Sequence, residues 1–120
     1  MTATQLALDL TRLAAAAATE KSATNVRAFD VSEQLFITDV FLICSVTSST
    51  QARAVQDAVE DALREHGAKA VRREGSREGR WILLDFTDIV VHVQHVEERE
   101  FYSLERLWRD CPEVSVEAAR

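Results

Sequence analysis

The sequence predicts one domain of the mixed α/β (α+β) class, with a sheet of about five strands and helices packed on it. Apolar residues recur at helical spacing in three segments, and short apolar or β-branched runs lie between those segments. The resulting order of helix, strands, helix, strands and helix contains no internal repeat and no low-complexity linker. With 120 residues, of which 47% are hydrophobic, the chain can fill one core without disulfides.

A helix followed by two strands is expected in the first part of the chain. The helix should cover residues 3–22, because Thr2-Ala3-Thr4-Gln5 has the form of a capping box and leucines follow at helical spacing. Residues 25–32, with Val26, Phe29 and Val31, are typical of a strand. Residues 39–46 are almost continuously apolar, as in a strand buried on both faces. We therefore place this second strand at the centre of the sheet.

A second helix is expected over residues 49–66. Ser48-Ser-Thr-Gln51 forms another capping box, and Gly67 is a residue type that ends helices. On the polar face, Arg53 with Asp57 and Glu60 with Arg64 are spaced i,i+4, the usual pattern of a solvated face, and we assign these charges no function. The apolar face consists of Ala52, Val55, Val59, Ala62 and Leu63.

In the second half of the chain, the sequence predicts a hairpin that follows a short strand and precedes a last helix. A strand at 68–73 and a polar loop at 73–80 lead to hairpin strands at 81–86 and 89–94, joined by a tight Thr87-Asp88 connection. A helix should run from Glu97 to near Asp110, because acids occupy its first turn and Pro112 stops it. Its shared apolar face would hold Phe101, Leu104, Leu107 and Trp108. The domain is then 1–112, with a frayed tail at 113–120.

Composition excludes several classes of protein. The net charge of −6 argues against a protein that grips nucleic acid with its whole surface. No apolar run approaches the roughly 20 residues of a membrane-spanning helix, and the amino end lacks a signal-peptide layout. We therefore expect a cytoplasmic protein without membrane contact. Cys44 and Cys111 lie too far apart for a C-x-x-C motif, so no disulfide framework is expected.

No motif predicts catalysis or a cofactor. His92 and His95 are three residues apart on a strand and point to opposite faces, which disfavours a shared metal ion. Asp85 and Asp88 bracket the hairpin turn, where aspartates more often bond the local backbone than act as acid and base. No phosphate-binding glycine loop or nucleophile motif occurs, so we expect no cofactor.

Three features suggest binding. The loop around residues 72–80 is the only net-basic segment, for which a solvated loop is the commoner explanation and RNA contact the alternative. In the strand at 81–86, Trp81, Leu83 and Asp85 share the face opposite Ile82 and Leu84. One of these faces covers the core. Large apolar side chains beside a charge are typical of a protein-binding surface, although helices on both faces of the sheet would bury both sets. In the next strand, the even positions also form a semi-polar face without an assigned partner, namely Asp88, Val90, His92 and Gln94.

Five blocks of sequence point to a known family through their order and spacing. They are Asp30-Val-Ser32, Thr38-Asp39-x-Phe-Leu-Ile, Arg73-Glu-Gly, Gly79-Arg-Trp-Ile-Leu-Leu-Asp with Asp88-Ile-Val-Val-His92, and Arg99-x-Phe-Tyr-x-Leu-Glu-x-Leu-Trp108. In these blocks the chain resembles the ribosomal silencing factor (RsfS, iojap-like) family over about residues 5–112. Gln94 departs from the pattern, because an apolar residue is common there in the family.

The resemblance implies a non-enzymatic translation repressor. It implies a fold related to nucleotidyltransferases, without their catalytic carboxylates and glycine-serine loop, and no cofactor. It implies a homodimer, little direct contact with nucleic acid, and binding to the fourteenth protein of the large ribosomal subunit. Occupying that surface would keep the small subunit from joining when nutrients are scarce. Carried over by position, the contact residues are Trp81, Leu83, Asp85, Asp88, His92, Arg99 and Tyr102, with Glu74 and Gly75 in an approach loop.

Two other functions stay open from the residues themselves. A nucleotidyltransferase-like enzyme would use Asp39, Asp85 and Asp88 with Mg²⁺, and it needs these carboxylates to converge at one edge of the sheet. An RNA-binding module would work through the arginines of residues 72–80, and its affinity would fall steeply with salt. The aromatic and apolar residues of the last helix, Tyr102, Leu104 and Trp108, more often belong to a core than to a contact surface.

Overall fold

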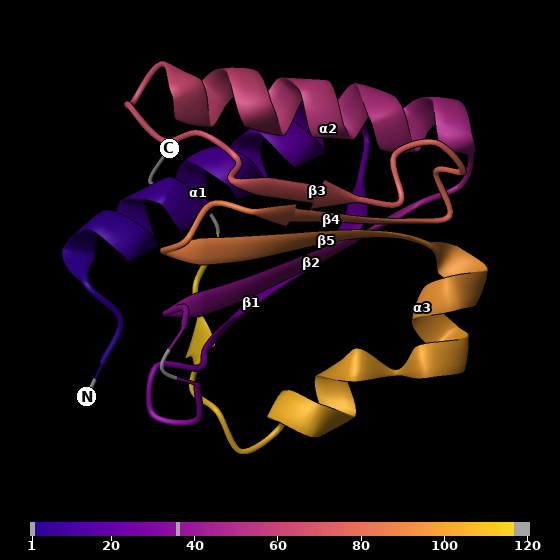
Figure 1. Ribbon diagram of the computed structural model, residues 1–120. Helices are drawn as coiled ribbons and strands as arrows, with labels where there is room; N and C mark the ends of the chain where they lie inside the picture. Colours follow the sequence, from indigo (N-terminus) through magenta and orange to yellow (C-terminus); the bar gives the residue numbers. More distant parts are fainter. Residues whose placement is uncertain (1, 36, 117–120) are drawn as a thin grey trace.

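Six strands form one mixed sheet in the order β3-β4-β5-β2-β1-β6 (Figure 1). The computed structural model describes residues 2–35 and 37–116. The strands are β1 (Thr24–Asp30), β2 (Val40–Val46), β3 (Arg72–Glu74), β4 (Trp81–Asp85), β5 (Ile89–His95) and β6 (Glu113–Val114). The predicted mixed sheet with helices packed on it is confirmed, with one strand more than the expected five.

The centre of the sheet is a parallel pair. β2 and β5 pair in parallel from Val40 with Ile89 to Val46 with His95. The neighbouring pairs are antiparallel: β1 lies beside β2, and β4 beside β5. The central position predicted for residues 39–46 is therefore confirmed, as is the hairpin of residues 81–94. A parallel pair at the centre explains the continuous apolar run of β2, because such strands are covered on both faces.

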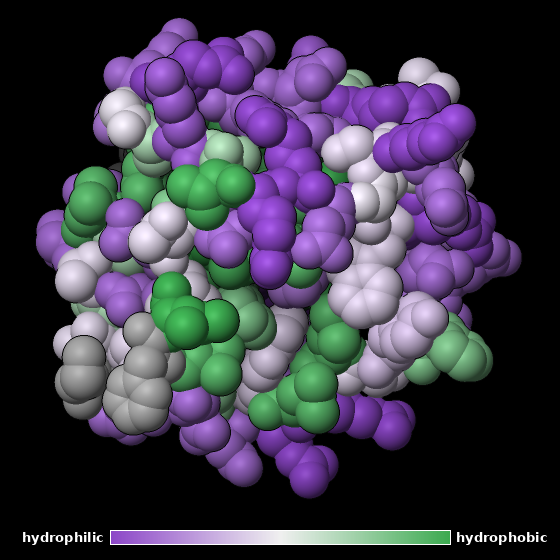
Figure 2. Space-filling model, viewed as in Figure 1, coloured by the Kyte–Doolittle hydropathy of each residue, from purple (hydrophilic) through white to green (hydrophobic). Residues whose placement is uncertain are grey.

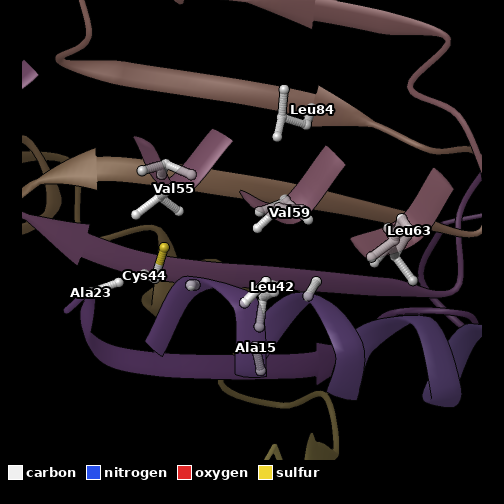
Figure 3. Close-up of a cluster of buried hydrophobic side chains, with 14 of the residues drawn as sticks. Ala15, Ala23, Leu42, Cys44, Val55, Val59, Leu63 and Leu84 are labelled. Carbon is white, nitrogen blue, oxygen red and sulfur yellow. The ribbon is translucent and has the colours of Figure 1, made fainter. Parts of the chain in front are cut away.

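Helices α1 (Gln5–Glu20) and α2 (Ser49–Arg64) cover one face of the sheet. Figure 3 shows how α2 side chains meet the strands: Val55, Val59 and Leu63 lie over Leu42 and Leu84. Each fully buried leucine contributes about 2 kcal/mol through the apolar surface that it removes from water. The side chain of Ser48 caps α2 as predicted, accepting from the amide of Gln51 at 3.0 Å. For α1, the cap is Thr4, whose side chain accepts from the amide of Ala7.

The prediction of a single long helix near the carboxyl end is wrong. The segment contains α3 (Val96–Tyr102) and the 3-10 helix η1 (Leu104–Trp108), and Ser103 between them has a left-handed backbone with φ of 47°. This break turns the apolar residues apart: Trp108 is buried, whereas Phe101 and Leu107 are exposed. The prediction of a frayed tail at 113–120 is also wrong at its start, because β6 pairs with β1. Residues 117–120 of the predicted tail lie outside the described residues.

Two local pairings differ from the i,i+4 prediction for α2. The carboxylate of Glu60 accepts from the guanidinium of Arg73 at 2.6 to 2.9 Å, and the side chain of Gln56 donates to it at 2.9 Å. Arg64 pairs with Asp61 instead of Glu60. Glu60 thus joins α2 to β3, and the Arg73 guanidinium holds the pKa of its carboxyl below the ordinary value. The third strand is also displaced, lying at Arg72–Glu74 and not at 68–73.

Among the described residues, none of the helices has both the length and the apolar character needed to cross a membrane.

Candidate functional site

The second face of the sheet carries the predicted binding residues of β4 and β5. On β4, Ile82 and Leu84 are completely buried against α2, whereas Trp81, Leu83 and Asp85 on the opposite face are half-buried. The structure therefore decides which face of β4 covers the core. The view in Figure 2 shows hydrophobic residues gathered in the middle and lower part of the molecule, with hydrophilic residues around the top and right.

Trp81 is held in place by His92. The indole N–H donates to Nδ1 of His92 at 3.1 Å. Because an indole nitrogen only donates, Nδ1 accepts, and the neutral ring carries its proton on Nε2. Burial lowers the pKa of His92 to about 4. His92 is thus a neutral, buried support for Trp81, and its predicted contact with a partner stays a prediction.

Tyr102 lies on the outer side of Trp81. The two rings are 4.9 Å apart, and Tyr102 is half-exposed at 49%. Trp81, Leu83 and Tyr102 therefore form one surface drawn from β4 and α3. The aromatic contacts continue inward, since Phe41 packs edge-on against both His92 at 5.4 Å and Trp108 at 4.7 Å. The sequence analysis missed Phe41. The available signal was its place in the apolar strand at 39–46, where it shares one face with Ile43 and Ser45.

Arg99, a predicted contact residue, makes its bonds inside the protein, and its contact with a partner stays a prediction. Its side chain is buried, 5% exposed. The guanidinium donates to the backbone carbonyl of Asn25, to Oγ of Ser45 at 3.1 Å, and twice to Oε2 of Glu105 at 3.2 Å. Arg99 therefore ties α3 and η1 to β1 and β2, and it fixes the helix that presents Tyr102.

The polar face of β5 is covered, not open. His92 and Gln94 are 6% and 0% exposed, and Val90 is also buried. Neither side-chain polar atom of Gln94 has a hydrogen-bond partner among the described residues. The prediction of a semi-polar face that lacks a partner is thus wrong for most of β5, because α3 and η1 pack over this side of the sheet. The open part of the face belongs to β4.

The two aspartates lie at the other end of the hairpin. Oδ1 of Asp85 accepts from the amide of Thr87 at 2.8 Å, as expected for an aspartate beside a tight turn. Thr87 has φ of 76°, so this bond helps to hold a backbone conformation that threonine rarely adopts. Asp88 is half-buried in the turn itself. Asp85 therefore shares the face of Trp81 and Leu83, but Asp88 follows the strand and lies beyond that row.

The predicted approach loop does border Trp81. Glu74, Gly75, Trp81 and Leu83 line an open groove of ≈ 400 Å³. Gly75 has φ of 82°, and a Cβ on this residue would collide with the carbonyl group of Trp81. At the other end of the loop, a Cβ on Gly79 would lie 2.6 Å from Cβ of Ser49. The loop thus needs glycine at both positions to pass so close to β4 and α2.

We expect Gly75→Ala to lower the free energy of unfolding by about 2 kcal/mol, because the added methyl group both strains the backbone and displaces Trp81. The matched control is Gly67→Ala, since Gly67 has the same φ of 82° but no atom within 4 Å of a built Cβ. Gly67→Ala should lower the free energy of unfolding by only about 1 kcal/mol, because it adds backbone strain without a collision. Urea unfolding monitored by tryptophan fluorescence measures both. Equal losses would show that the collision with Trp81 has no effect.

The two alternative functions gain little from the geometry. Arg72 pairs with Glu74, and Arg73 pairs with Glu60. Arg80 pairs with both Glu97 and Glu98, so the basic loop presents few unpaired cations. Oδ2 of Asp39 accepts from the amide of Thr4 at 2.9 Å. In the described part of the chain no group of three or more His, Cys, Asp or Glu side chains is arranged to hold a metal ion. Asp39, Asp85 and Asp88 therefore do not form the convergent set that the enzyme hypothesis needs.

Comparison with known proteins agrees with the sequence blocks. The family described as "Ribosomal silencing factor during starvation" matches residues 4–120. The chain is 40% identical over 104 residues to the ribosomal silencing factor RsfS of Bacillus subtilis, covering 87% of this chain and 88% of that protein. It is 28% identical over 74% of its length, and 40% of the relative's, to the mouse protein named "Mitochondrial assembly of ribosomal large subunit protein 1". A crystal structure from Chromobacterium violaceum superposes with a TM-score of 0.81 at 29% identity, covering 93% of this chain and 94% of that one.

Proposed function

The chain belongs to the ribosomal silencing factor family, and on that premise we propose that it binds the large ribosomal subunit and prevents the small subunit from joining. The partner in this proposal is the fourteenth protein of the large subunit, on the surface that faces the small subunit. The mechanism is steric and requires no catalysis. It would reduce translation in the cytoplasm when nutrients are limiting, and the free protein would be a homodimer.

The observation that carries the proposal is the half-exposed row on β4. Trp81 and Leu83 supply large apolar side chains, and Asp85 supplies a carboxylate on the same face. Tryptophan and tyrosine are the residue types that most often dominate a protein interface, and Trp81 is already fixed by His92 and Tyr102. A side chain that is held before binding loses little conformational entropy on binding.

Charge supports a basic protein as the partner. The chain carries a net charge of −6, and the Trp81 face adds Asp85 to its apolar residues. Ribosomal proteins are basic, so this surface attracts them, whereas the phosphates of bare ribosomal RNA are repelled. The relative whose name refers to the ribosomal large subunit is consistent with this choice of subunit.

Sedimentation of mixed ribosomal subunits tests the proposal. Purified large and small subunits are mixed with the protein and separated on a sucrose gradient. The wild-type protein should travel with the large subunit and lower the yield of joined ribosomes. The variant Trp81→Ala/Asp85→Ala should bind more than tenfold more weakly, because it removes both the apolar anchor and the carboxylate. Tyr102→Ala, at an exposed position, gives a second variant that does not threaten the fold.

The matched control is Leu6→Ala/Asp9→Ala, which removes an exposed leucine and an exposed aspartate from α1, on the other side of the sheet. This control should bind as the wild type does. A wild-type protein that stays at the top of the gradient would contradict the function. Full binding by folded forms of both Trp81→Ala/Asp85→Ala and Tyr102→Ala would contradict the site but leave the function standing.

A further inference from the structure

Phe101 is a second exposed aromatic residue beside the proposed binding row. Its side chain is 80% exposed, the largest exposed fraction among the exposed large hydrophobic residues of the described chain. It is not isolated: the Phe101 ring packs edge-on against Tyr102 at 5.0 Å, and Tyr102 contacts Trp81 at 4.9 Å. The aromatic surface of β4 therefore continues without a break onto the outer side of α3.

The position of Phe101 is well defined by its surroundings. Arg99 anchors α3 from below through its bonds to Asn25, Ser45 and Glu105. The carbonyl of Arg99 accepts from the amide of Ser103, which closes the helix. A frayed end would let an apolar ring fold back onto the protein. Here the ring is held in solvent by a helix whose other side is buried, an arrangement that leaves apolar area available to a partner.

Two glutamates of α3 lie near Phe101 in the sequence. Glu97 lies four residues before Phe101 and three before Glu100, so its side chain is on the same side of α3 as each of them. Glu100 directly precedes Phe101. Both side chains are exposed. Arg80 pairs with Glu97 and Glu98, but no described residue pairs with the carboxylate of Glu100. Arg99, the one cation within α3, points inward to Glu105.

We propose that Phe101, with Glu97 and Glu100, is a second docking point for the basic protein partner, and that it takes an arginine or lysine side chain of that partner. The inference rests on the proposed function and extends its surface from β4 to α3. The cationic head would lie near Glu100 while the ring of Phe101 covers the stem or the planar guanidinium. Aromatic rings attract such cations within about 6 Å of the ring centre, and a neighbouring carboxylate adds a charge-assisted hydrogen bond.

The chemistry of this point favours a basic protein over other occupants. A nucleic acid would bring phosphates toward two carboxylates, which repel them. A second copy of this acidic chain would meet the same repulsion unless it presented one of its own arginines. A basic surface can place a cation against both the ring of Phe101 and the carboxylate of Glu100. Because Phe101, Tyr102 and Trp81 are in contact, one partner can touch all three rings.

Equilibrium binding to purified large subunits, with fluorescently labelled protein, tests this docking point. Phe101→Ala should weaken binding about tenfold. Phe101→Tyr, which keeps the ring, should stay within about twofold of the wild type, and Phe101→Leu, which keeps apolar area but no ring, should weaken binding at least about threefold. Glu100→Gln should slow association and flatten its dependence on salt. Leu6→Ala, on α1, is the control for loss of an exposed apolar side chain.

The outcomes separate this inference from the proposed function. Wild-type binding that Phe101→Ala, Phe101→Leu and Glu100→Gln all leave unchanged would overturn the docking point while the function stands. Equal binding by Phe101→Leu and the wild type would exclude the cation on the ring. If sedimentation velocity shows that Phe101→Ala splits a dimer of the free protein while large-subunit binding is unchanged, the occupant is a second copy and the proposal is wrong. Absence of wild-type binding would overturn both together.

Discussion

Replacing Arg99 by alanine is expected to lower the free energy of unfolding by about 3–5 kcal/mol, the usual loss when one partner of a buried ion pair is removed. The guanidinium is 5% exposed and serves four acceptor contacts on three elements. Without it, the carboxylate of Glu105, which is 23% exposed, keeps only the more distant guanidinium of Arg27 at 4.0 Å. Oε1 of that carboxylate already lacks a hydrogen-bond partner among the described residues. Chemical unfolding at pH 7 measures the loss.

Three further variants show whether the ion pair is the cause. Arg106→Ala removes an exposed arginine from the neighbouring η1 and should change stability by less than about 0.5 kcal/mol. Arg99→Lys keeps the charge but not the planar fork, and an intermediate loss is expected. Arg99→Ala/Glu105→Ala removes both charges and should recover part of the loss. If Arg99→Ala is no less stable than Arg106→Ala, then Arg99 does not anchor α3.

Lowering the pH from 7 to 5 is expected to remove about 2 kcal/mol of stability through His92 alone. The pKa of His92 is lowered from 6.5 to about 4 by burial, so the unfolded chain binds a proton in this range while the folded protein does not. The contribution is complete above pH 6.5, and it falls by about 1.4 kcal/mol per pH unit until the pH nears 4. Protonation would also place a hydrogen on Nδ1, the atom that accepts from Trp81.

The control for this pH dependence is His92→Asn, whose side-chain oxygen can accept from the Trp81 indole but does not titrate. Unfolding free energies of both proteins are compared between pH 7 and pH 5. This range avoids the carboxyls of Asp30, Glu60, Glu97 and Glu113, whose lowered pKa values make their stabilisation disappear at lower pH. The slope should be smaller for His92→Asn. Parallel slopes would mean that His92 is accessible to protons in the folded protein.

Predictions that depend on nearby residues agreed well with the structure. The capping box at Ser48, the apolar stripe of α2 and the hairpin of residues 81–94 are local patterns, and all three were found. The continuous apolar run of residues 40–46 predicted a central strand correctly. Such patterns succeed because helices and hairpins bond residues that are close in the chain, and because a strand's neighbours must cover whichever faces are apolar.

Predictions that depended on distant contacts were less successful. Arg99 was expected at the binding surface because of its place in a family block, but it turns inward to Asn25, 74 residues away in sequence. Glu60 was expected to pair within α2 and instead pairs with Arg73 on β3. The last helix was expected to be continuous, yet it breaks at Ser103, and the following turn carries Trp108 to the core while Phe101 stays in solvent.

The sequence by itself determined the class of fold, the order of most elements and the family, because each rests on local spacing or on blocks of neighbouring residues. Only the tertiary structure decided which face of β4 is open, how Trp81, Tyr102 and Phe101 join into one surface, and that Arg99 is buried beneath α3. These properties arise when the sheet brings β1, β4, β5 and α3 together. The burial and charge pairing of a side chain are set by those distant neighbours, which the spacing of residues along one strand or helix does not reveal.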